Sequence, residues 1–207
     1  MKARELFGLQ IDQGLGIFSL KQSGKAVATS NLNSANWVSN IKIRRKFTPN
    51  SFWEVSGAAF LLPLSVQGAK TGPRLLKLEG GLGGAYRVLP RMLLLPSLGF
   101  RYQTLSTSEV VGYRNITGGQ ISLAQAYLFE SQQTLHTAVY LAVFGNENYQ
   151  FSSKNRELGA RMSLEWPLDS PLITSLYLGG EWQTQSLLLN GVNLTSSYYS
   201  GFIGVLF

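Results

Sequence analysis

Few side chains in this chain have the types and spacing that catalysis requires. One histidine, His136, and no cysteine occur among the 207 residues. A histidine base needs a hydroxyl nucleophile and an orienting acid within hydrogen-bond reach. The only aspartates, Asp12 and Asp169, are distant from His136 in the sequence, and no local motif joins a serine to it. We therefore expect no catalytic residues and no enzymatic activity, with His136 contacting backbone or water.

The sequence also lacks the pattern of a metal, phosphate or nucleic-acid site. Without cysteine there are no thiolate ligands, and a single histidine cannot form a histidine-rich metal cluster. The glycines of 80–84 superficially match a phosphate-binding loop, but the following Lys-Ser/Thr pair and the helix are missing. The net charge of +7 comes from dispersed bases with one cluster in 42–46, whereas nucleic-acid proteins concentrate theirs. We expect no metal, no cofactor and no nucleic-acid partner.

The elements that must position the remaining polar residues are β-strands. Along 158–166 the residues on one face are Leu158, Ala160, Met162, Leu164 and Trp166, and those on the other are Gly159, Arg161, Ser163 and Glu165. The same period of two recurs over 76–88, 98–103 and 176–183. A helix would scatter these residues over all faces, and each glycine in it would cost about 1 kcal/mol. The alternation therefore predicts strands.

Ten such runs cover the chain, and they are long. Their ranges are 6–20, 36–47, 52–65, 74–89, 92–105, 118–130, 134–145, 156–167, 172–185 and 195–207. A tilted strand needs about 9–11 residues to cross a bilayer, whereas strands of soluble domains have about five or six. Charged residues make up 14% of the chain, against about a quarter in soluble domains. Both features favour a membrane-spanning sheet.

The connections between the runs alternate between short and long. Short turns lie near 48–51, 89–91, 131–133 and 167–171, and long connections cover 21–35, 66–73, 106–117, 146–155 and 186–194. Outer-membrane barrels have short periplasmic turns and longer external loops. We predict an all-β, antiparallel, up-and-down transmembrane barrel of about ten strands, forming one domain over 1–207 with both termini periplasmic. Because Gly14 and Gly16 interrupt the first run, eight strands are the alternative.

The two faces of the predicted strands differ in the way a membrane barrel requires. The proposed outward faces are apolar and the inward faces carry charges, glycine and small polar residues, the reverse of a soluble barrel. A soluble lipocalin-like barrel or sandwich would need an unusually large core. Four tryptophans lie near strand ends, where an aromatic girdle forms. Trp53 and Trp166 are expected at the periplasmic boundary, and Trp37 and Trp182 at the outer one.

The end of the chain resembles the last strand of bacterial outer-membrane proteins. It reads SSYYSGFIGVLF, with a terminal Phe207 preceded by Val205, Ile203 and Tyr199 at alternate positions. This resemblance implies an outer-membrane, porin-like barrel of a Gram-negative bacterium, whose last strand is recognised by the barrel-assembly machinery. The start, MKARELFGLQ, lacks the apolar core of a secretory signal. We therefore expect that a signal peptide has been removed.

The inward charges carry most of the information about the lumen. If the apolar face of each strand points outward, the bases that point inward are Lys42, Arg44, Lys46, Lys77, Arg87, Arg101 and Arg161. The acids that point inward are Asp12, Glu54, Glu79, Glu157, Glu165 and Glu181. This near balance favours ion pairs across the lumen. Small barrels are filled by side chains, whereas those of about 16 strands hold an open channel. We expect a narrow or occluded, charge-lined lumen.

Several functions are compatible with such a barrel. The leading expectation is a minor channel or a structural outer-membrane protein. The alternative is an interaction barrel whose external loops or wall bind a protein partner, a surface ligand or another subunit, and a membrane hydrolase is a third class. The charged residues of the expected loops are Lys21, Lys25, Lys70, Arg74, Arg114, Lys154, Arg156, Glu109 and Glu147. The excess of bases suits the phosphates of lipopolysaccharide, or an ordinary solvated surface. Expected partners are thus outer-membrane lipid, lipopolysaccharide and the assembly machinery.

Overall fold

The computed structural model describes residues 8–24, 27–68, 72–106, 113–145, 151–189 and 191–207. They form eleven strands: β1 (Gly8–Gly24), β2 (Val27–Thr48), β3 (Ser51–Gln67), β4 (Arg74–Gly84), β5 (Tyr86–Leu89), β6 (Met92–Ser106), β7 (Tyr113–Leu128), β8 (Thr134–Gly145), β9 (Phe151–Pro167), β10 (Ser175–Leu189) and β11 (Val192–Leu206). Only Ala85 separates β4 from β5, so 74–89 acts as one crossing and the wall has ten strands. No helix long and apolar enough to span a membrane occurs among these residues.

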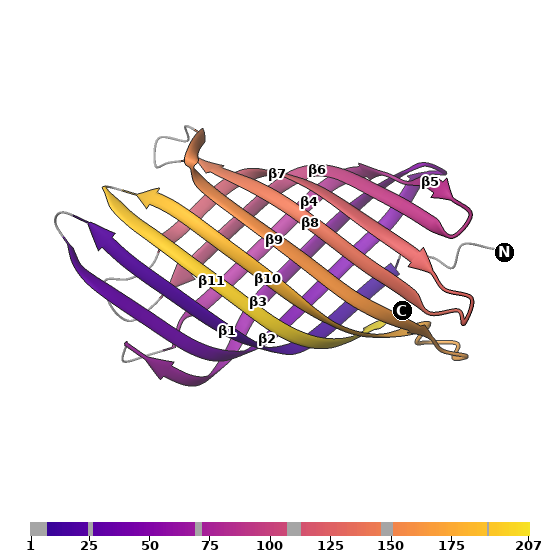
Figure 1. Cartoon of the computed structure of the whole chain (residues 1–207), viewed down its shortest axis with the longest axis horizontal. Coiled ribbons are helices and arrows are strands. Elements are labelled where there is room, and N and C mark those ends of the chain that lie inside the picture. Colours follow the sequence, from indigo (N-terminus) through magenta and orange to yellow (C-terminus); the bar gives the residue numbers. More distant parts are fainter. Residues whose placement is uncertain (1–7, 25–26, 69–71, 107–112, 146–150, 190) are drawn as a thin grey trace.

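The strands close into one antiparallel ring (Figure 1). Apart from β4 and β5, which do not pair with each other, strands that are neighbours in sequence are paired; β6 pairs with both β4 and β5, and β1 pairs with β11 to complete the circle. The amide of Phe207 donates to the carbonyl of Leu9 at 2.9 Å, extending this seam beyond β11. The predicted all-β barrel of ten strands is confirmed, and the eight-stranded alternative is wrong.

The first strand is a full member of the wall despite its glycines. β1 pairs with β11 from Gln10 to Gly24 without a break in register. A side chain at Gly14 or Gly16 would collide with Phe202 or Tyr198, respectively, on the neighbouring strand. These glycines therefore make room for large inward residues and do not interrupt the strand.

Two expected loops are mostly strand. β2 begins at Val27, not at 36, and the β10–β11 pairing continues to Leu189 and Val192, so 186–194 is a tight hairpin. Gly191 supplies the positive φ of 76° in its turn. Of the charges expected in loops, Lys25, Lys70, Glu109 and Glu147 lie outside the described residues, as does the side chain of Arg114.

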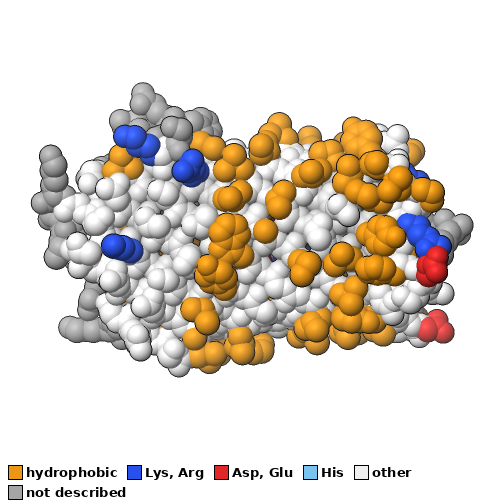
Figure 2. All heavy atoms as spheres, viewed as in Figure 1, with side chains coloured by type: hydrophobic (Ala, Val, Ile, Leu, Met, Phe, Trp, Pro, Cys, Tyr) orange, Lys and Arg blue, Asp and Glu red, His pale blue; other side chains and the backbone are white. Residues whose placement is uncertain are grey.

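The sidedness of the strands inverts partway along the barrel. One end, called the turn-side end, carries the short turns and both ends of the described chain, and the other is the loop-side end (Figure 1). On β1 near the turn side, Leu9 faces out and Asp12 faces in, whereas Lys21 faces out and Leu20 faces in near the loop side. Figure 2 shows the same change over a whole face, with hydrophobic side chains over the middle and turn-side parts and polar atoms toward the loop-side end.

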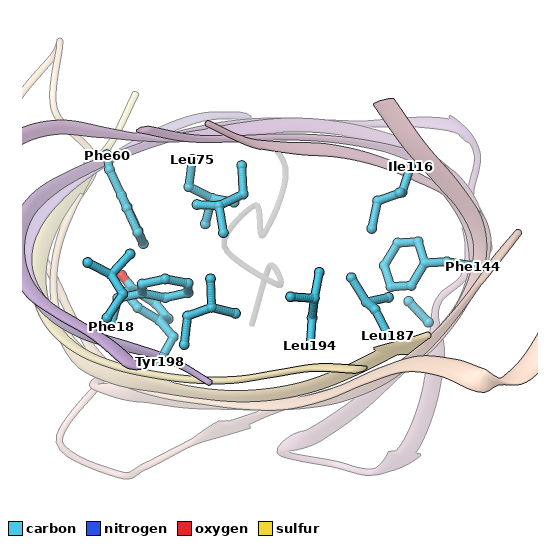
Figure 3. Packing of buried hydrophobic residues seen from close by; sticks show 12 residues of the cluster. Phe18, Phe60, Leu75, Ile116, Phe144, Leu187, Leu194 and Tyr198 are labelled. Carbon is cyan, nitrogen blue, oxygen red and sulfur yellow. The ribbon is translucent and has the colours of Figure 1, made fainter. Parts of the chain in front are cut away.

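Buried apolar side chains inside the barrel form two groups. The larger group, called the apolar layer, projects into the lumen toward the loop side (Figure 3). It consists of Phe18, Leu20, Leu32, Phe60, Leu75, Leu105, Ile116, Ala142, Phe144, Leu187, Leu194 and Tyr198. The smaller group, Phe52, Ala85 and Leu95, lies near the turn side. The charged residues occupy the space between and around these groups.

Candidate functional site

A fully buried carboxylate, Glu157 on β9, is the centre of a network that crosses the lumen. It accepts hydrogen bonds from the ammonium of Lys77 at 3.2 Å, the guanidinium of Arg101, the hydroxyl of Tyr140 at 2.8 Å and the amide of Gln185 at 3.2 Å. These partners come from β4, β6, β8 and β10. Since β4 and β9 are not neighbours in the ring, the Lys77–Glu157 pair bridges opposite walls.

Arg101 brings a second carboxylate, on β4, into the network. Its other guanidinium nitrogen donates to Glu79 at 2.6 Å, and its planar group lies 4.2 Å from the centre of the Tyr140 ring. The Lys77 ammonium also donates to the amide oxygen of Gln183. Arg101 is 1% exposed, and a base this deeply buried is stable only with such charged and polar partners.

A second set of ion pairs surrounds Arg161. Its guanidinium donates to Asp12, lies 3.7 Å from Glu181 and stacks over the ring of Phe202 at 3.9 Å. Asp12 also accepts from Asn40 at 3.1 Å. Because Asp12 is on β1 and Arg161 on β9, with two strands between them, this pair also spans the interior. Together these residues and the Glu157 set are called the mid-barrel network.

A third group lies nearer the turn side. Arg44 makes two hydrogen bonds of 2.5 and 2.8 Å to Glu54. The imidazole of His136 lies 2.6 Å from one oxygen of Glu165, and the hydroxyl of Ser175 donates to the other oxygen. A nucleophile must bond to the base itself, but Ser175 bonds to the acid. These three side chains therefore do not form a nucleophile–base–acid chain.

Two small cavities lie among the charged residues. One has a volume of about 80 Å³ and the other about 110 Å³, and both are lined by Lys42, Arg44 and Arg161. Cavities of this size and polarity hold several water molecules. The larger cavity ends against Phe60 and Tyr198 of the apolar layer. The charged, cavity-lining part of the lumen therefore adjoins the apolar layer directly.

One set of rings in the apolar layer comes from β1, β3 and β11, which lie on the same part of the ring. The rings of Phe18 and Phe60 are 5.6 Å apart in an edge-to-face arrangement, and Phe60 is 5.5 Å from the ring of Tyr198. Figure 3 shows a second set across the lumen, where Phe144 points toward Leu187. Its residues are less than 10% exposed, so the layer is a packed core.

Most charges predicted to face inward do lie inside. Those buried or half-buried there are Asp12, Lys42, Arg44, Glu54, Lys77, Glu79, Arg101, Glu157, Arg161, Glu165 and Glu181. Arg87 and Lys46 are exposed, although Arg87 is paired with Leu93 of the inner face and Lys46 alternates with Lys42 and Arg44. Arg87 is on β5, whose only partner is β6, so no opposing wall covers it. Lys46 lies in the last turn-side residues of β2, where the barrel opens.

The apolar layer is the feature that the sequence analysis missed. The sequence does contain a signal for this layer. Phe18 and Leu20 occupy the inward positions of β1, and the polar Ser19 and Lys21 occupy the outward positions that alternate with them. The prediction used one sidedness for the whole strand, apolar outward and polar inward. Runs with the opposite sidedness were therefore assigned to loops.

The aromatic and C-terminal residues lie on the outer wall. Trp37 is exposed and Trp53, Trp166 and Trp182 are half-buried. The indole of Trp37 donates to Gln13 at 2.6 Å, a residue that also faces outward. In the last strand the outward residues are Tyr199, Ile203 and Val205, with Phe207 exposed at its end.

The described residues contain no group of three or more His, Cys, Asp or Glu side chains that could hold a metal ion. The remaining chemistry of the interior is that of ion pairs, hydrogen bonds and enclosed water. Such groups can close a lumen, or line a path for ions if a path exists.

Comparison with known proteins supports the fold. The sequence matches no protein-family model and no curated protein. The outer membrane protease OmpT from Escherichia coli superposes with a TM-score of 0.61 and 10% identity, over 96% of this chain and 95% of that one. Neisserial surface protein A gives 0.41, with 12% identity and 97% of each chain covered. The translocator domain of the autotransporter NalP from Neisseria meningitidis gives 0.49, with 11% identity, 97% of this chain and 89% of that one.

The likeness to OmpT shows a shared fold, and the outer surface explains it physically. A closed ring leaves no unpaired strand edge, which is what a bilayer demands of a spanning sheet. Exposed large side chains such as Leu98, Phe100 and Met162 cover its middle, where water would be excluded. The protein is a β-barrel of the bacterial outer-membrane type.

Proposed function

We propose that this protein is a structural outer-membrane barrel that does not conduct ions, because the apolar layer closes its lumen. The observation that carries this proposal is the stacking of that layer on the mid-barrel network. An ion entering from the turn side would find water and charged groups in the cavities, and would then meet Phe60, Leu75 and Tyr198.

The physical barrier is loss of hydration. An ion that crosses a packed apolar layer must shed its water without new ligands, which costs tens of kcal/mol in a medium of low polarity. Hydrophobic constrictions block conduction by the same effect, since they dewet. The Lys77–Glu157 bridge adds a second obstruction below the layer.

The direct test is single-channel recording of the detergent-folded protein in a planar bilayer, with a heat-modifiability gel to confirm folding. We expect a folded, silent barrel. A double substitution, Phe18→Ala with Phe60→Ala, removes the rings from one side of the layer and is expected to produce conductance. The control is Phe52→Ala, since Phe52 is equally buried but belongs to the turn-side group.

The competing function is a minor channel. Steady conductance steps in the unmodified protein that change with Arg101→Ala would establish a water-filled path through the network and refute the closed lumen. Silence in the double variant, together with normal folding, would contradict the role given to the apolar layer.

We also propose that the protein is not an enzyme. His136 is oriented by Glu165, but the nearby Ser175 bonds to that acid. Incubation with phospholipid and peptide substrates is expected to give the same background rate for the unmodified protein and for His136→Ala. A rate that disappears in His136→Ala would make the protein a hydrolase.

The outer surface of the barrel suggests which partners bind it. We propose that the last strand, with Phe207 exposed beside the β1–β11 seam, is the segment read by the barrel-assembly machinery. An interaction role through the loops or the wall is the second candidate function. It is favoured by a groove on the lipid-facing wall, described below.

A further inference from the structure

A broad groove of about 810 Å³ runs across the outer wall, which is within the range of about 300–1,000 Å³ typical of small-molecule sites. It crosses the outer side of the strands β8, β9, β10, β11 and β1 and extends to β2 and β3. Its floor is formed where small residues, Gly180 and Gly201, are paired across β10 and β11. Its sides are exposed apolar residues such as Leu15, Met162 and Tyr199. In Figure 2, a white band, which comprises backbone and side chains that are neither hydrophobic nor charged, separates bands of hydrophobic side chains on the face that carries these strands.

The wall changes character directly above the groove, toward the loop side. The row Trp182, Tyr199 and Ile17 borders it, and the next outward row is Thr184, Ser197 and Ser19. The row after that consists of Arg156, Ser186, Thr195 and Lys21, which are aligned by the strand register. Two exposed bases therefore flank a field of hydroxyl groups.

The charge on this face has one sign. Among the described residues, no Asp or Glu points outward from β1, β9, β10 or β11. The acidic side chains visible in Figure 2 lie at the opposite end of the barrel. Arg156 lies four positions before Ala160, which lines the groove, and this is about 13 Å at about 3.3 Å per residue along a strand. Side chains of Lys and Arg reach several ångströms along such a surface.

We propose that this face is a binding site for an anionic, phosphate-bearing lipid of the membrane leaflet on the loop side. An acyl chain would lie in the groove over Gly180 and Gly201, where the missing side chains let it approach the backbone. The phosphate would lie between Lys21 and Arg156, and the hydroxyls of Ser186 and Thr195 would donate hydrogen bonds to it.

A second copy of the chain fits this face less well. In a two-fold dimer the same patch would face itself, which would bring Lys21 and Arg156 of both copies close together without an acid to offset them. A lipid phosphate supplies the missing negative charge. A lipid without net negative charge would fill the groove but would not offset the charge of the two bases.

The test uses the full chain in vesicles of phosphatidylcholine, with Trp37, Trp53 and Trp166 replaced by Phe so that Trp182 alone reports on the groove. Brominated-chain phosphatidylglycerol, which quenches tryptophan on contact, is compared with brominated-chain phosphatidylcholine at equal mole fraction. We expect stronger quenching by the phosphatidylglycerol, and a preference that falls as salt rises.

Two variants locate the two halves of the site. Lys21→Gln with Arg156→Gln is expected to reduce the lipid preference by about fivefold for each base removed, since a base at a membrane surface contributes about 1 kcal/mol. The matched control is Arg45→Gln with Arg87→Gln, two exposed bases at the turn-side end. Gly201→Leu fills the groove, and because a side chain there meets nothing within 4 Å, the barrel is expected to fold. It should weaken quenching by both lipids.

Equal quenching by the two brominated lipids, unchanged in the double variant, would reduce the face to ordinary lipid contact and overturn the proposal. A stable dimer in detergent that is lost in Gly201→Leu would overturn it in favour of a second copy. Neither result bears on ion conduction, so the proposal of a closed lumen is tested separately, by the single-channel recordings.

Discussion

Replacing Glu157 by Gln tests whether the mid-barrel network holds the barrel together. The substitution keeps the shape of the side chain but leaves Lys77 without the ion pair seen at 3.2 Å. Arg101 loses one of its two carboxylates and keeps Glu79. Removing one partner of a buried pair costs about 3–5 kcal/mol. Because water-sized cavities adjoin the network, we take the lower end, about 3 kcal/mol.

The measurement is a thermal or denaturant unfolding curve of the folded barrel in detergent, followed by heat modifiability on a gel. For a chain of about 200 residues, a loss of 1 kcal/mol lowers Tm by about 2–4 °C. Glu157→Gln should therefore lower Tm by about 6–12 °C. The matched control is Glu130→Gln, which breaks the exposed pair with Arg91 at 2.8 Å and should cost no more than about 1 kcal/mol.

A compensating change isolates the pair itself. Lys77→Met in the Glu157→Gln background removes the stranded ammonium, and it should recover part of the lost stability through the coupling between contacting residues. If Glu157→Gln and Glu130→Gln have equal effects on unfolding, then water relaxes around the network and the buried charges are not structural. If Lys77→Met lowers the stability of the Glu157→Gln variant by as much as it lowers that of the unmodified protein, the two residues are not coupled.

Two further predictions concern sidedness and assembly. Leu20→Asp buries a charge in the apolar layer and should prevent folding or cost several kcal/mol, whereas Ser19→Asp, one residue away on the outer surface, should leave the unfolding curve within about 0.5 kcal/mol of the unmodified protein. Equal losses in the two would refute the inverted arrangement. Phe207→Ala should fold normally into lipid vesicles alone but slowly in vesicles that contain the assembly machinery, as followed by the folded band on a gel. An unchanged assisted rate would remove Phe207 from the assembly signal.

The sequence predicted the features that depend on local pattern. The alternation from Leu158 to Trp166 reappears as β9, with Arg161 and Glu165 inside and Met162 outside. Turn-forming residues such as Pro49 and Pro90 lie where the chain reverses. The number of strands could also be predicted, because each alternating run is long enough to be recognised as one strand of the barrel.

The contacts inside the barrel could not be predicted in the same way. Lys77 and Glu157 are 80 residues apart, and Asp12 and Arg161 are 149 apart. Which inward residues meet depends on the stagger of strands around the closed ring, and no local pattern encodes that stagger. The groove is likewise invisible in the sequence, because Gly180 and Gly201 become neighbours only through the register of β10 with β11.

The inverted sidedness of the strands has a consequence for how the ring closes. Within a bilayer, apolar surface gains little by leaving lipid for protein, so packing there lacks the driving force that folds soluble domains. Toward the loop side the outer wall is polar, and Phe18, Leu20 and Leu194 point inward. This loop-side part of the barrel, here called the collar, stands in water, where burial of apolar surface is favourable by about 25 cal/mol per Å². Because β1 and β11 contribute these residues on either side of the seam, joining the two strands releases water from the collar. The barrel thus carries a small soluble-type core whose formation favours closure of the membrane-spanning part.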